Sequence, residues 1–577
     1  MISIFSIGCA TITSMRHEFQ KILPIFLLII LTFLLSSDLL FHQGIFKAHD
    51  IEANISRLGA FYLSIKEEIL LPGWAEHVAN GYGSPILLFS YLSPYYAQLP
   101  FIFIGLSLIT STKLLIAIAW IISAVTMYFW LKQHFSSWPS WIASLLYVYA
   151  PYRISDIYAR GSISEHVAFV IIPVVGLCWM RVVQKPSISR AIWLGISLAL
   201  LFYSHPFLLV IMFPMFALYT LVLLKTHKPS VSRFVGLAIS FAVCFSLCAI
   251  LILPMVFERK YLHYEISPFT HTWENEYAKL SQLILPQWTF KDRLGKIEYQ
   301  TWQIGLVHLG FVVIGLFMLV QKKIRSHWLL FGLVTTGIGI FMSLKISKFV
   351  YAAVPILQQI QFPWRYGSLI SIMVPFVVAA VCEQLSKSLS SNKQRSIFIF
   401  TTVALVLLLS LPYARGRNYK VISDNYYLYE QQTNTEGLAT TPIWAASSET
   451  YTRANVTPKI IEGNGEITML SRKGSMHVYQ LKSSSNVRVV DETFYFPNWQ
   501  VLANKQPISI EFQDPNYRGL ITYRLDKGDY LIETVFKDTK IRYFARIITL
   551  GSTVIVVLLL LVQKPLKHFR RIKEYEE

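Results

Sequence analysis

Charge is scarce in this chain, acidic residues (33) are outnumbered by basic ones (52), and there are only five cysteines. Charged residues make up 15% of the 577 positions, against roughly 25% in soluble domains. The five cysteines lie near the N-terminus or inside apolar runs, so the long polar segments hold no disulfide framework or zinc cluster. The sequence also lacks a P-loop, a dinucleotide fingerprint, a nucleophile elbow and a zinc-binding helix motif. These absences leave soluble-nucleotide chemistry without support.

Apolar residues, by contrast, make up 54% of the chain. They gather into blocks of roughly 17–25 residues, the length at which a helix crosses a bilayer. The net charge of +19 would suit nucleic acid, but the basic residues fill short gaps between these blocks, with no acidic residue among them. The four gaps contain Arg181, Lys185 and Arg190; Lys225, Lys228 and Arg233; Lys322, Lys323 and Arg325; and Lys387, Lys393 and Arg395. Such gaps are typical of cytoplasmic loops, so the composition predicts a polytopic α-helical membrane protein and no nucleic-acid partner.

The same gaps predict how the chain crosses the membrane. With Arg16 and Lys21 inside, the run at residues 22–41 passes outward as an uncleaved anchor. Further spans are expected near residues 165–180, 190–204, 206–224, 233–257, 304–321, 327–343, 364–386, 396–412 and 543–562. Three more runs, at 94–110, 113–132 and 139–150, separate two segments that should both lie outside. Either the first run enters the membrane and returns without crossing it, or the third run lies along the membrane–water interface. Two crossings there give about twelve spans, with both termini in the cytoplasm.

The last outer segment differs in kind from the others. Residues 1–412 are predicted to form the membrane domain, with outer loops at 42–93, 151–165 and 258–303. Residues 413–541, by contrast, contain alternating polar and apolar stretches, which are typical of strands. These stretches are His477–Leu481, Asn498–Leu502, Gly519–Leu525 and Tyr530–Phe536. Turn-forming residues separate them. We therefore expect an extracytoplasmic antiparallel β domain of sandwich type, followed at 542–577 by a final span and a basic cytoplasmic tail.

The first candidate for chemistry is the pair His49 and Asp50, eight residues beyond the end of the first apolar run. An ionisable pair there lies at the membrane–water boundary, where it can meet a lipid-borne substrate and a polar partner. Asp50 could act as a general base on an acceptor hydroxyl. Together with Glu52 it could also supply oxygen ligands to a divalent cation. The alternative is an ordinary solvated loop that caps a helix.

The second candidate is the polar segment 151–166 between two apolar runs. Its ionisable residues include Arg153, Asp156, Arg160, Glu165 and His166. Its serines could cap a helix that begins near Glu165, and a glutamate in the first turn would favour the helix dipole. Capping does not account for the two arginines, whose planar guanidinium groups suit the paired oxygens of a phosphate.

Three further residues are candidates for substrate binding. Arg365 lies at the outer end of a span, where it could bind a phosphate or simply reach lipid headgroups. His205 lies between two spans and could equally be an ordinary loop histidine. Tyr91 belongs to a tyrosine-rich stretch that could stack on a sugar, line a lipid groove or anchor the chain at the interface.

Several of these motifs, taken in order, resemble a known family. They are His49-Asp50 followed by Arg57, Gly81-Tyr82-Gly83-Ser84-Pro85 with Tyr91-x-Ser93-Pro94, and Pro151-Tyr152-Arg153 through Arg160-Gly161 to Glu165. Over roughly residues 20–390 the chain resembles bacterial membrane proteins called 6-pyruvoyl-tetrahydropterin synthase-related, of the GT-C glycosyltransferase superfamily. Phe496-Pro497-Asn498-Trp499 and the strands that follow resemble the outer β domain of YfhO-type membrane proteins. The family's name does not imply pterin chemistry here.

The resemblance implies a fold of GT-C type and an enzyme that uses a polyprenyl-phosphate sugar on the outer face. Asp50 occupies the position of the family's catalytic base or metal ligand. Glu165 corresponds to a second acidic site, with Asp156 as the alternative. Where some members carry a paired-acid metal motif, this chain has Glu165-His166, so dependence on Mg²⁺ or Mn²⁺ is left open, with Asp50, Glu52, Glu165 and His166 as candidate ligands.

The function expected on these grounds is transfer of a sugar from a polyprenyl-phosphate donor to an extracytoplasmic acceptor, in a bacterial plasma membrane. Asp50 and Glu165 are the expected catalytic residues. The expected substrate-binding residues are His49, Arg57, Tyr91, Arg153, Asp156, Arg160, His205 and Arg365. The alternatives are a transporter or flippase for a lipid-linked glycan and a non-catalytic envelope assembly factor. A transporter would be expected to hold its charged residues near mid-membrane rather than at helix ends.

Overall fold

The chain folds into two compact units. The structure, a computed structural model, describes residues 2–67, 69–266, 271–291, 297–298, 300–323, 326–389, 391–430, 440–445 and 452–576. The first unit comprises Met1–Ile51, Thr112–Leu237 and Thr272–Val421, and the second comprises Glu52–Ser111, Ala238–His271 and Ile422–Glu577. Each unit is therefore assembled from three separate stretches of sequence.

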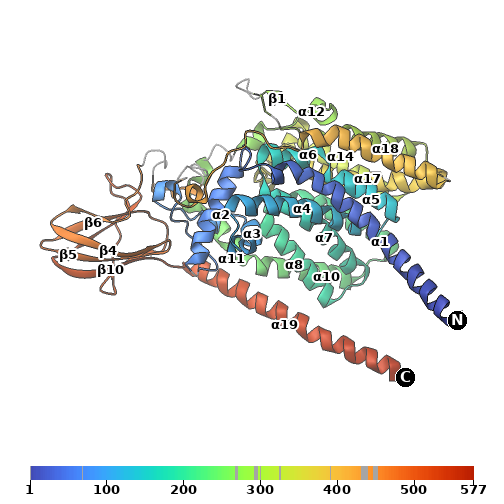
Figure 1. The fold of residues 1–577 in the computed structure, drawn as a ribbon. Coiled ribbons are helices and arrows are strands. Elements are labelled where there is room, and N and C mark those ends of the chain that lie inside the picture. The colour runs from blue at the N-terminus through green and yellow to red at the C-terminus, as the bar shows by residue number, and fades with distance from the viewer. Residues whose placement is uncertain are drawn as a thin grey trace. The chain divides into compact units, whose positions relative to one another are not determined.

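The first unit is a helical bundle (Figure 1). Its long helices are α1 (Ile2–Phe41), α4 (Leu108–Leu131), α5 (Ser137–Val148), α7 (Ile163–Gln184), α8 (Ile188–Ser204), α9 (Pro206–Thr226), α13 (Leu306–Val320), α14 (His327–Ser343), α17 (Gly367–Ser388) and α18 (Asn392–Ser410). Shorter helices are α6 (Pro151–Ser155), α12 (Leu280–Ile284), α15 (Lys348–Ala353) and α16 (Pro355–Gln358). Residues 367–382 of α17 are all buried, because α5, α13 and α14 pack around it. A helix that is apolar on every face is stable only in such surroundings or in lipid.

Most of the predicted spans coincide with observed helices. Within the described residues, seven helices are long and apolar enough to cross a membrane, or eight if one bent pair counts as a single span. The seven are Ile22–Phe41, Leu108–Leu131, Ile163–Gln184, Pro206–Thr226, Pro363–Leu385, Asn392–Tyr413 and Lys540–Val562. Helices α8, α13 and α14 are apolar but shorter. The polytopic helical architecture is thus confirmed, while the number of about twelve crossings stays a prediction.

One predicted span is not a continuous helix. Residues 233–257 were expected to cross as one helix, but the chain bends by 72° between α10 (Val231–Leu247) and α11 (Ala249–Phe257). The break falls at Cys248, where the backbone leaves the helical conformation. This stretch is therefore a broken span or a re-entrant loop.

The structure also bears on the three apolar runs between the first two outer segments. The first run forms α3 (Ser93–Phe103), whose 11 residues are too short to cross a hydrocarbon core of roughly 30 Å. The third run forms α5, in which nine residues are buried against neighbouring helices, so it does not lie along a lipid surface. The burial of α5, together with the shortness of α3, favours the alternative in which the first run does not cross.

The second unit holds the predicted β domain (Figure 1). Its strands are β3 (Lys459–Glu462), β4 (Gly465–Lys473), β5 (Met476–Ser483), β6 (Val487–Phe494), β7 (Trp499–Ala503), β8 (Gln506–Ile508), β9 (Leu520–Leu525) and β10 (Gly528–Phe536). They form an antiparallel five-stranded sheet of order β4-β5-β10-β7-β8 and a three-stranded sheet of order β3-β6-β9. Apolar side chains of both sheets share one core, and the hydroxyls of Tyr479 and Tyr523 join the sheets at 2.7 Å. The sandwich-like domain is confirmed.

The second unit also contains a helix pair and part of the first outer loop. Besides the strands it includes α2 (Ile51–Lys66), α3, and α11 packed against α19 (Lys540–Glu576). Trp74, Tyr82 and Leu88 belong to the core of the β sandwich, and Trp74 packs edge-on against Trp499 at 5.2 Å. The outer loop expected to belong to the membrane domain therefore supplies part of the β domain's core instead.

Candidate functional site

The polar segment 151–160 is wound in an unusual way. Pro151 starts the short helix α6, where its missing N–H is not needed, and residues Asp156–Arg160 then form one π-helical turn. Gly161 ends the turn in the left-handed conformation, with φ of +72°. Single π turns inside helices occur frequently at functional sites. The widened turn determines which side chains of the segment face the same way.

A buried charged cluster is built on this segment. The Arg160 guanidinium contacts Asp156 Oδ1 and lies 3.0 Å from Glu165 Oε2, while the Tyr152 hydroxyl donates to Glu165 Oε1 at 2.7 Å. The guanidinium also lies 4.7 Å from the centre of the Trp364 ring. All five side chains are buried. We call Tyr152, Asp156, Arg160, Glu165 and Trp364 the Arg160 cluster.

The backbone of Asp50 is attached to the end of the same segment. The His49 amide donates to the Ala159 carbonyl at 3.1 Å, and the Asp50 amide donates to the Arg160 carbonyl at 2.7 Å. Gly161 permits this approach, because a Cβ there would lie 2.8 Å from the Ile51 nitrogen. The side chains of His49 and Asp50 are exposed, whereas the cluster is buried. Two segments that are far apart in sequence, both predicted to lie outside, are therefore joined, with an exposed acid beside a buried ion pair.

The charges in this region influence one another. Burial, reinforced by the neighbouring Glu165 carboxylate, raises the pKa of Asp156 well above its usual value, with Asp50 adding to the effect and Arg160 and Arg365 opposing it. In the part of the chain that the structure describes, Asp156 Oδ2 is buried without a hydrogen-bond partner. Burial therefore favours the protonated form of the Asp156 carboxyl, and a protonated carboxyl can donate a hydrogen bond to a ligand.

His205 and Arg365 lie near enough to act on the Glu165 charge. Arg365 is buried, its Nη1 donating to the Ile360 carbonyl at 2.8 Å and to Gln361 Oε1 at 3.2 Å. His205 precedes the first residue of α9, and burial lowers its pKa to about 3, so the ring is neutral at physiological pH. Asp50, Asp156, Arg160, Glu165, His205 and Arg365 thus lie in one region of the first unit, and their roles stay predictions.

Arg153 does not belong to this group. Its guanidinium is enclosed by the rings of Trp120, Tyr147 and Phe169 at 4.2–4.6 Å and donates to Ser123 Oγ at 2.8 Å. A fully buried arginine in an aromatic enclosure holds α6 against its neighbouring helices. This placement does not fit the phosphate contact predicted for Arg153.

Glu165 and His166, two of the predicted ligands of a divalent cation, each bond to other groups of the protein. The His166 ring lies 3.1 Å from the Ile116 carbonyl and packs edge-on against Trp120, while both Glu165 oxygens already accept hydrogen bonds. Within the residues that the structure describes, no three His, Cys, Asp or Glu side chains form a group able to hold a metal ion. Glu165 and His166 therefore do not fit a cation site as they are arranged. Glu52, Arg57 and Tyr91 lie in the second unit, all half-buried.

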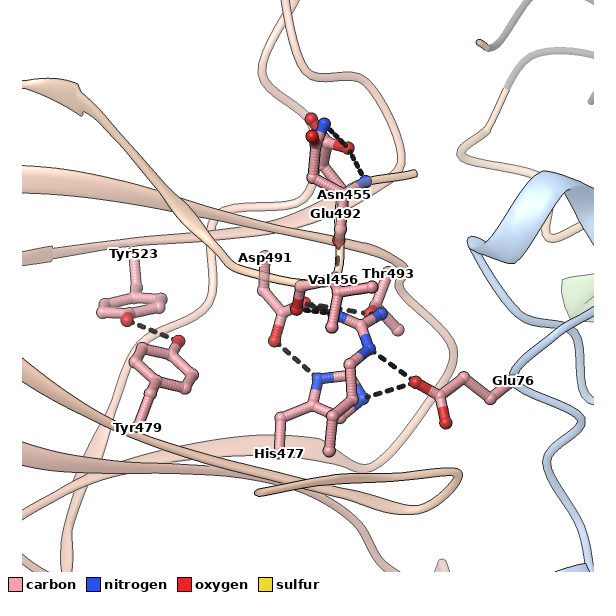
Figure 2. A network of polar contacts seen from close by, with 10 residues as sticks. Glu76, Asn455, Val456, His477, Tyr479, Asp491, Glu492, Thr493 and Tyr523 are labelled. Carbon is pink, nitrogen blue, oxygen red and sulfur yellow. Dashed lines mark hydrogen bonds and ion pairs between the residues drawn. The ribbon is translucent and has the colours of Figure 1, made fainter. Parts of the chain in front are cut away.

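A second buried charge network, which the sequence did not indicate, lies in the second unit. Figure 2 shows His477 between two carboxylates, 2.7 Å from Asp491 Oδ2 and 3.8 Å from Glu76 Oε1. Arg472 contacts both acids, at 2.5 Å from Glu76 and 3.5 Å from Asp491. Burial by itself would raise the pKa of Asp491, but His477, Arg472 and Thr493 outweigh it and lower the pKa to about 2. The network ties the loop that carries Glu76 to strands β4, β5 and β6.

The chain was compared with known proteins by sequence and by structure. Residues 89–417 match a family model described as 6-pyruvoyl-tetrahydropterin synthase related domain, membrane protein. No protein of curated function matches the chain. Among solved structures, two cryo-EM structures of arabinofuranosyltransferase AftD from Mycobacteria are similar, at 13% and 12% identity with TM-scores of 0.37 and 0.38. Each match covers 68% of this chain, which spans 26% and 28% of those two chains.

Proposed function

The chain belongs to the family of membrane proteins related to 6-pyruvoyl-tetrahydropterin synthase, and on that premise we propose that it is a membrane glycosyltransferase of GT-C type. The proposed reaction moves a sugar from a polyprenyl-phosphate donor to an extracytoplasmic acceptor in the cell envelope. The observation that carries the proposal is the attachment of Asp50 to the segment that holds Arg160 and Glu165. A membrane site suits this chemistry because the donor's lipid tail stays in the bilayer.

In the proposed reaction Asp50 is the general base. Its exposed carboxylate takes the proton of the acceptor hydroxyl while that oxygen attacks the anomeric carbon of the donor sugar. The bond between that carbon and the phosphate oxygen breaks, and its electron pair leaves with the polyprenyl phosphate. A single displacement of this kind inverts the configuration at the anomeric carbon.

The leaving phosphate needs positive charge and hydrogen-bond donors. Arg160 and Arg365 supply the cationic field, which is stronger at a buried site than in water. In its protonated form, which burial favours, the Asp156 carboxyl is a further donor to a phosphate oxygen. Glu165 and Tyr152 position Arg160 rather than act on substrate, since their polar atoms are already bonded within the cluster.

Asp50→Asn tests the proposal directly. The purified protein in lipid nanodiscs is given a panel of polyprenyl-phosphate sugars, and release of polyprenyl phosphate is measured with and without an envelope-glycan acceptor. Loss of a general base is expected to lower the rate about 10²–10⁴-fold. Asp526→Asn, which changes an exposed acid in a turn of the β domain, is the matched control and should keep the wild-type rate. Wild-type turnover by Asp50→Asn would remove Asp50 from the mechanism.

A chelator arm of the same assay examines the cation. Because Arg160 and Tyr152 already occupy both Glu165 oxygens, we expect turnover to survive EDTA. Turnover that disappears on chelation and returns with Mg²⁺ or Mn²⁺ would contradict this expectation and require the Glu165 side chain to rearrange.

A further inference from the structure

A short basic motif occurs twice in the first unit. Residues 185–190 read Lys-Pro-Ser-Ile-Ser-Arg, and residues 228–233 read Lys-Pro-Ser-Val-Ser-Arg. The first copy leads from α7 into α8, and the second leads from α9 into α10. Both copies lie in loops that the sequence predicts to face the cytoplasm. We call residues 185–190 the first motif and residues 228–233 the second motif.

The two motifs adopt the same local structure. Arg190 and Arg233 are the third residues of α8 and α10. In the first motif Arg190 Nη1 donates to the carbonyl of Lys185, and in the second Arg233 Nη1 donates to the carbonyl of Lys228. An arginine in the first turn opposes the positive end of the helix dipole, so helix stability does not account for its presence in both motifs. The contact instead holds each guanidinium close to the lysine of its own motif.

The two motifs lie beside each other. Arg233 Nε donates at 2.6 Å to the carbonyl of Val183, which lies just before the first motif. A Cβ at Gly236 in α10 would lie 3.7 Å from the Pro186 side chain, so the start of α10 packs against the end of α7 and the first motif. The basic side chains of both motifs therefore belong to one surface. We call it the twin basic surface, and it consists of Lys185, Arg190, Lys228 and Arg233.

The charge of the twin basic surface is not balanced by acids of the neighbouring sequence. Residues 166–257, which include both motifs and the helices that flank them, contain no aspartate or glutamate. Within the part of the chain that the structure describes, none of the four basic side chains forms an ion pair with a carboxylate. The two arginines bond to backbone carbonyls and to Ser230 Oγ, and such neutral groups do not cancel a positive charge.

Exposed apolar side chains accompany these charges. Ile188 and Val231 occupy the same place in the two motifs and are 57% and 79% exposed, and Phe234 in the next turn of α10 is 52% exposed. Both motifs also follow apolar helices, α7 and α9, that are long enough to cross a membrane. A surface that combines basic and apolar side chains at helix ends fits the boundary between lipid headgroups and acyl chains.

We propose that the twin basic surface binds anionic phospholipids of the bilayer, with a lipid phosphate at the lysine and arginine of each motif. The positive charge favours a lipid with net negative charge over a zwitterionic one, and both guanidinium and ammonium groups bind phosphate oxygens. The exposed Ile188 and Val231 favour a lipid over a soluble anion, because only a lipid brings hydrocarbon to them. The proposal does not depend on glycosyl transfer, because none of these residues is placed in that reaction.

Lipid binding is measured on the full-length protein in detergent by native mass spectrometry. The lipid probes are phosphatidylglycerol and phosphatidylcholine with the same acyl chains. The soluble competitors are glycerol 3-phosphate, a short single-stranded RNA and polyglutamate. Together these probes separate a lipid site from a site for free phosphate, for nucleic acid or for an acidic protein.

The variants remove two charges at a time. The first is Lys185→Gln with Lys228→Gln, whose exposed side chains are not needed for folding. The second is Arg190→Gln with Arg233→Gln. The matched control is Lys387→Gln with Lys393→Gln, which removes two exposed lysines where α17 leads into α18, in another loop predicted to face the cytoplasm.

The proposal expects the wild type and the control to bind phosphatidylglycerol equally well and to bind phosphatidylcholine more weakly. Each of the two motif variants should bind phosphatidylglycerol about tenfold more weakly or worse. Equal affinity for the two lipids, unchanged binding by the lysine variant, or an equal loss in the control would overturn the proposal. So would release of the bound lipid by glycerol 3-phosphate, RNA or polyglutamate, which would assign the surface to a soluble anion. The unfolding temperature of each variant shows that it is folded when it is tested.

Discussion

Replacing Arg160 by glutamine removes the cation on which the buried cluster depends. In the folded protein the guanidinium lies 3.0 Å from Glu165 and contacts Asp156, and the exposed fractions of the three side chains are 6%, 0% and 1%. Without it the Glu165 carboxylate is left buried with the Tyr152 hydroxyl as its main donor. Removing one partner of a buried ion pair typically costs about 3–5 kcal/mol. We therefore expect Arg160→Gln to lower the free energy of unfolding by about that amount.

The reciprocal substitution and the double variant test whether the loss comes from the pair itself. Glu165→Gln leaves Arg160 in contact with Asp156, so its effect should be smaller, about 2 kcal/mol. The variant that carries both substitutions buries two neutral amides and no unpaired charge. Its loss should therefore be smaller than the sum of the single losses by about 1–3 kcal/mol.

The assay is unfolding of the purified protein in mild detergent, followed by intrinsic tryptophan fluorescence, because Trp364 lies against the Arg160 guanidinium. The matched control is the Arg524 and Glu462 pair of the β domain, whose atoms lie 2.8 Å apart but whose side chains are 56% and 52% exposed. An exposed pair is screened by solvent, so the same cycle there should show little coupling. Additive losses at Arg160 and Glu165, or an Arg160→Gln protein as stable as the wild type, would refute the reasoning.

Three further predictions follow from the same geometry. The raised pKa of Asp156 means that its contribution to stability is complete below pH about 4 and is lost as the pH rises towards the folded-state pKa. Asp156→Asn should therefore flatten the fall in unfolding temperature as the pH rises above about 4. The lowered pKa of Asp491, about 2, makes the protein less stable in acid: roughly 2 kcal/mol of stability should be lost as the pH falls from 4 to 2. An Asp491→Asn protein should already be less stable at pH 7 and should lack this acid-induced loss. Gly161→Ala should lower stability by about 1–3 kcal/mol, because its positive φ and the nearby Ile51 backbone both oppose a Cβ. Gly310→Ala in α13, where a Cβ meets nothing within 4 Å, should be neutral or stabilising.

Much of the architecture could be predicted from the sequence because its causes are local. A block of apolar residues such as 206–224 forms a helix wherever water is excluded, and the structure has α9 at Pro206–Thr226. Alternation of polar and apolar residues predicted strand Tyr530–Phe536, which is the core of β10. Asn504 and Lys505 are among the turn-forming residues that separate the predicted strands, and both adopt positive φ between β7 and β8, as a tight hairpin requires.

The candidate site was predictable only in part. Asp50 and Glu165 were expected on the same side of the membrane, and the backbone bonds of His49 and Asp50 to residues 159 and 160 place them in one region. The separation of Arg153 from Arg160 was not predictable. Residues seven apart lie on one face of an α-helix, but the π turn at Asp156–Arg160 adds residues to the turn and rotates Arg160 away from Arg153.

The sequence by itself determined which segments are helices and strands, which ends of them carry charge, and which acids and arginines are available for chemistry. These properties depend on hydropathy, periodicity and turn residues, which act over a few positions. Tertiary structure alone decided that Arg160 pairs with Glu165 while Arg153 is enclosed by aromatic rings, and that Glu76 joins His477 and Asp491 across some 400 positions of sequence. Long-range pairing is set by how whole elements pack, because a buried charge is stable only where another element brings its partner.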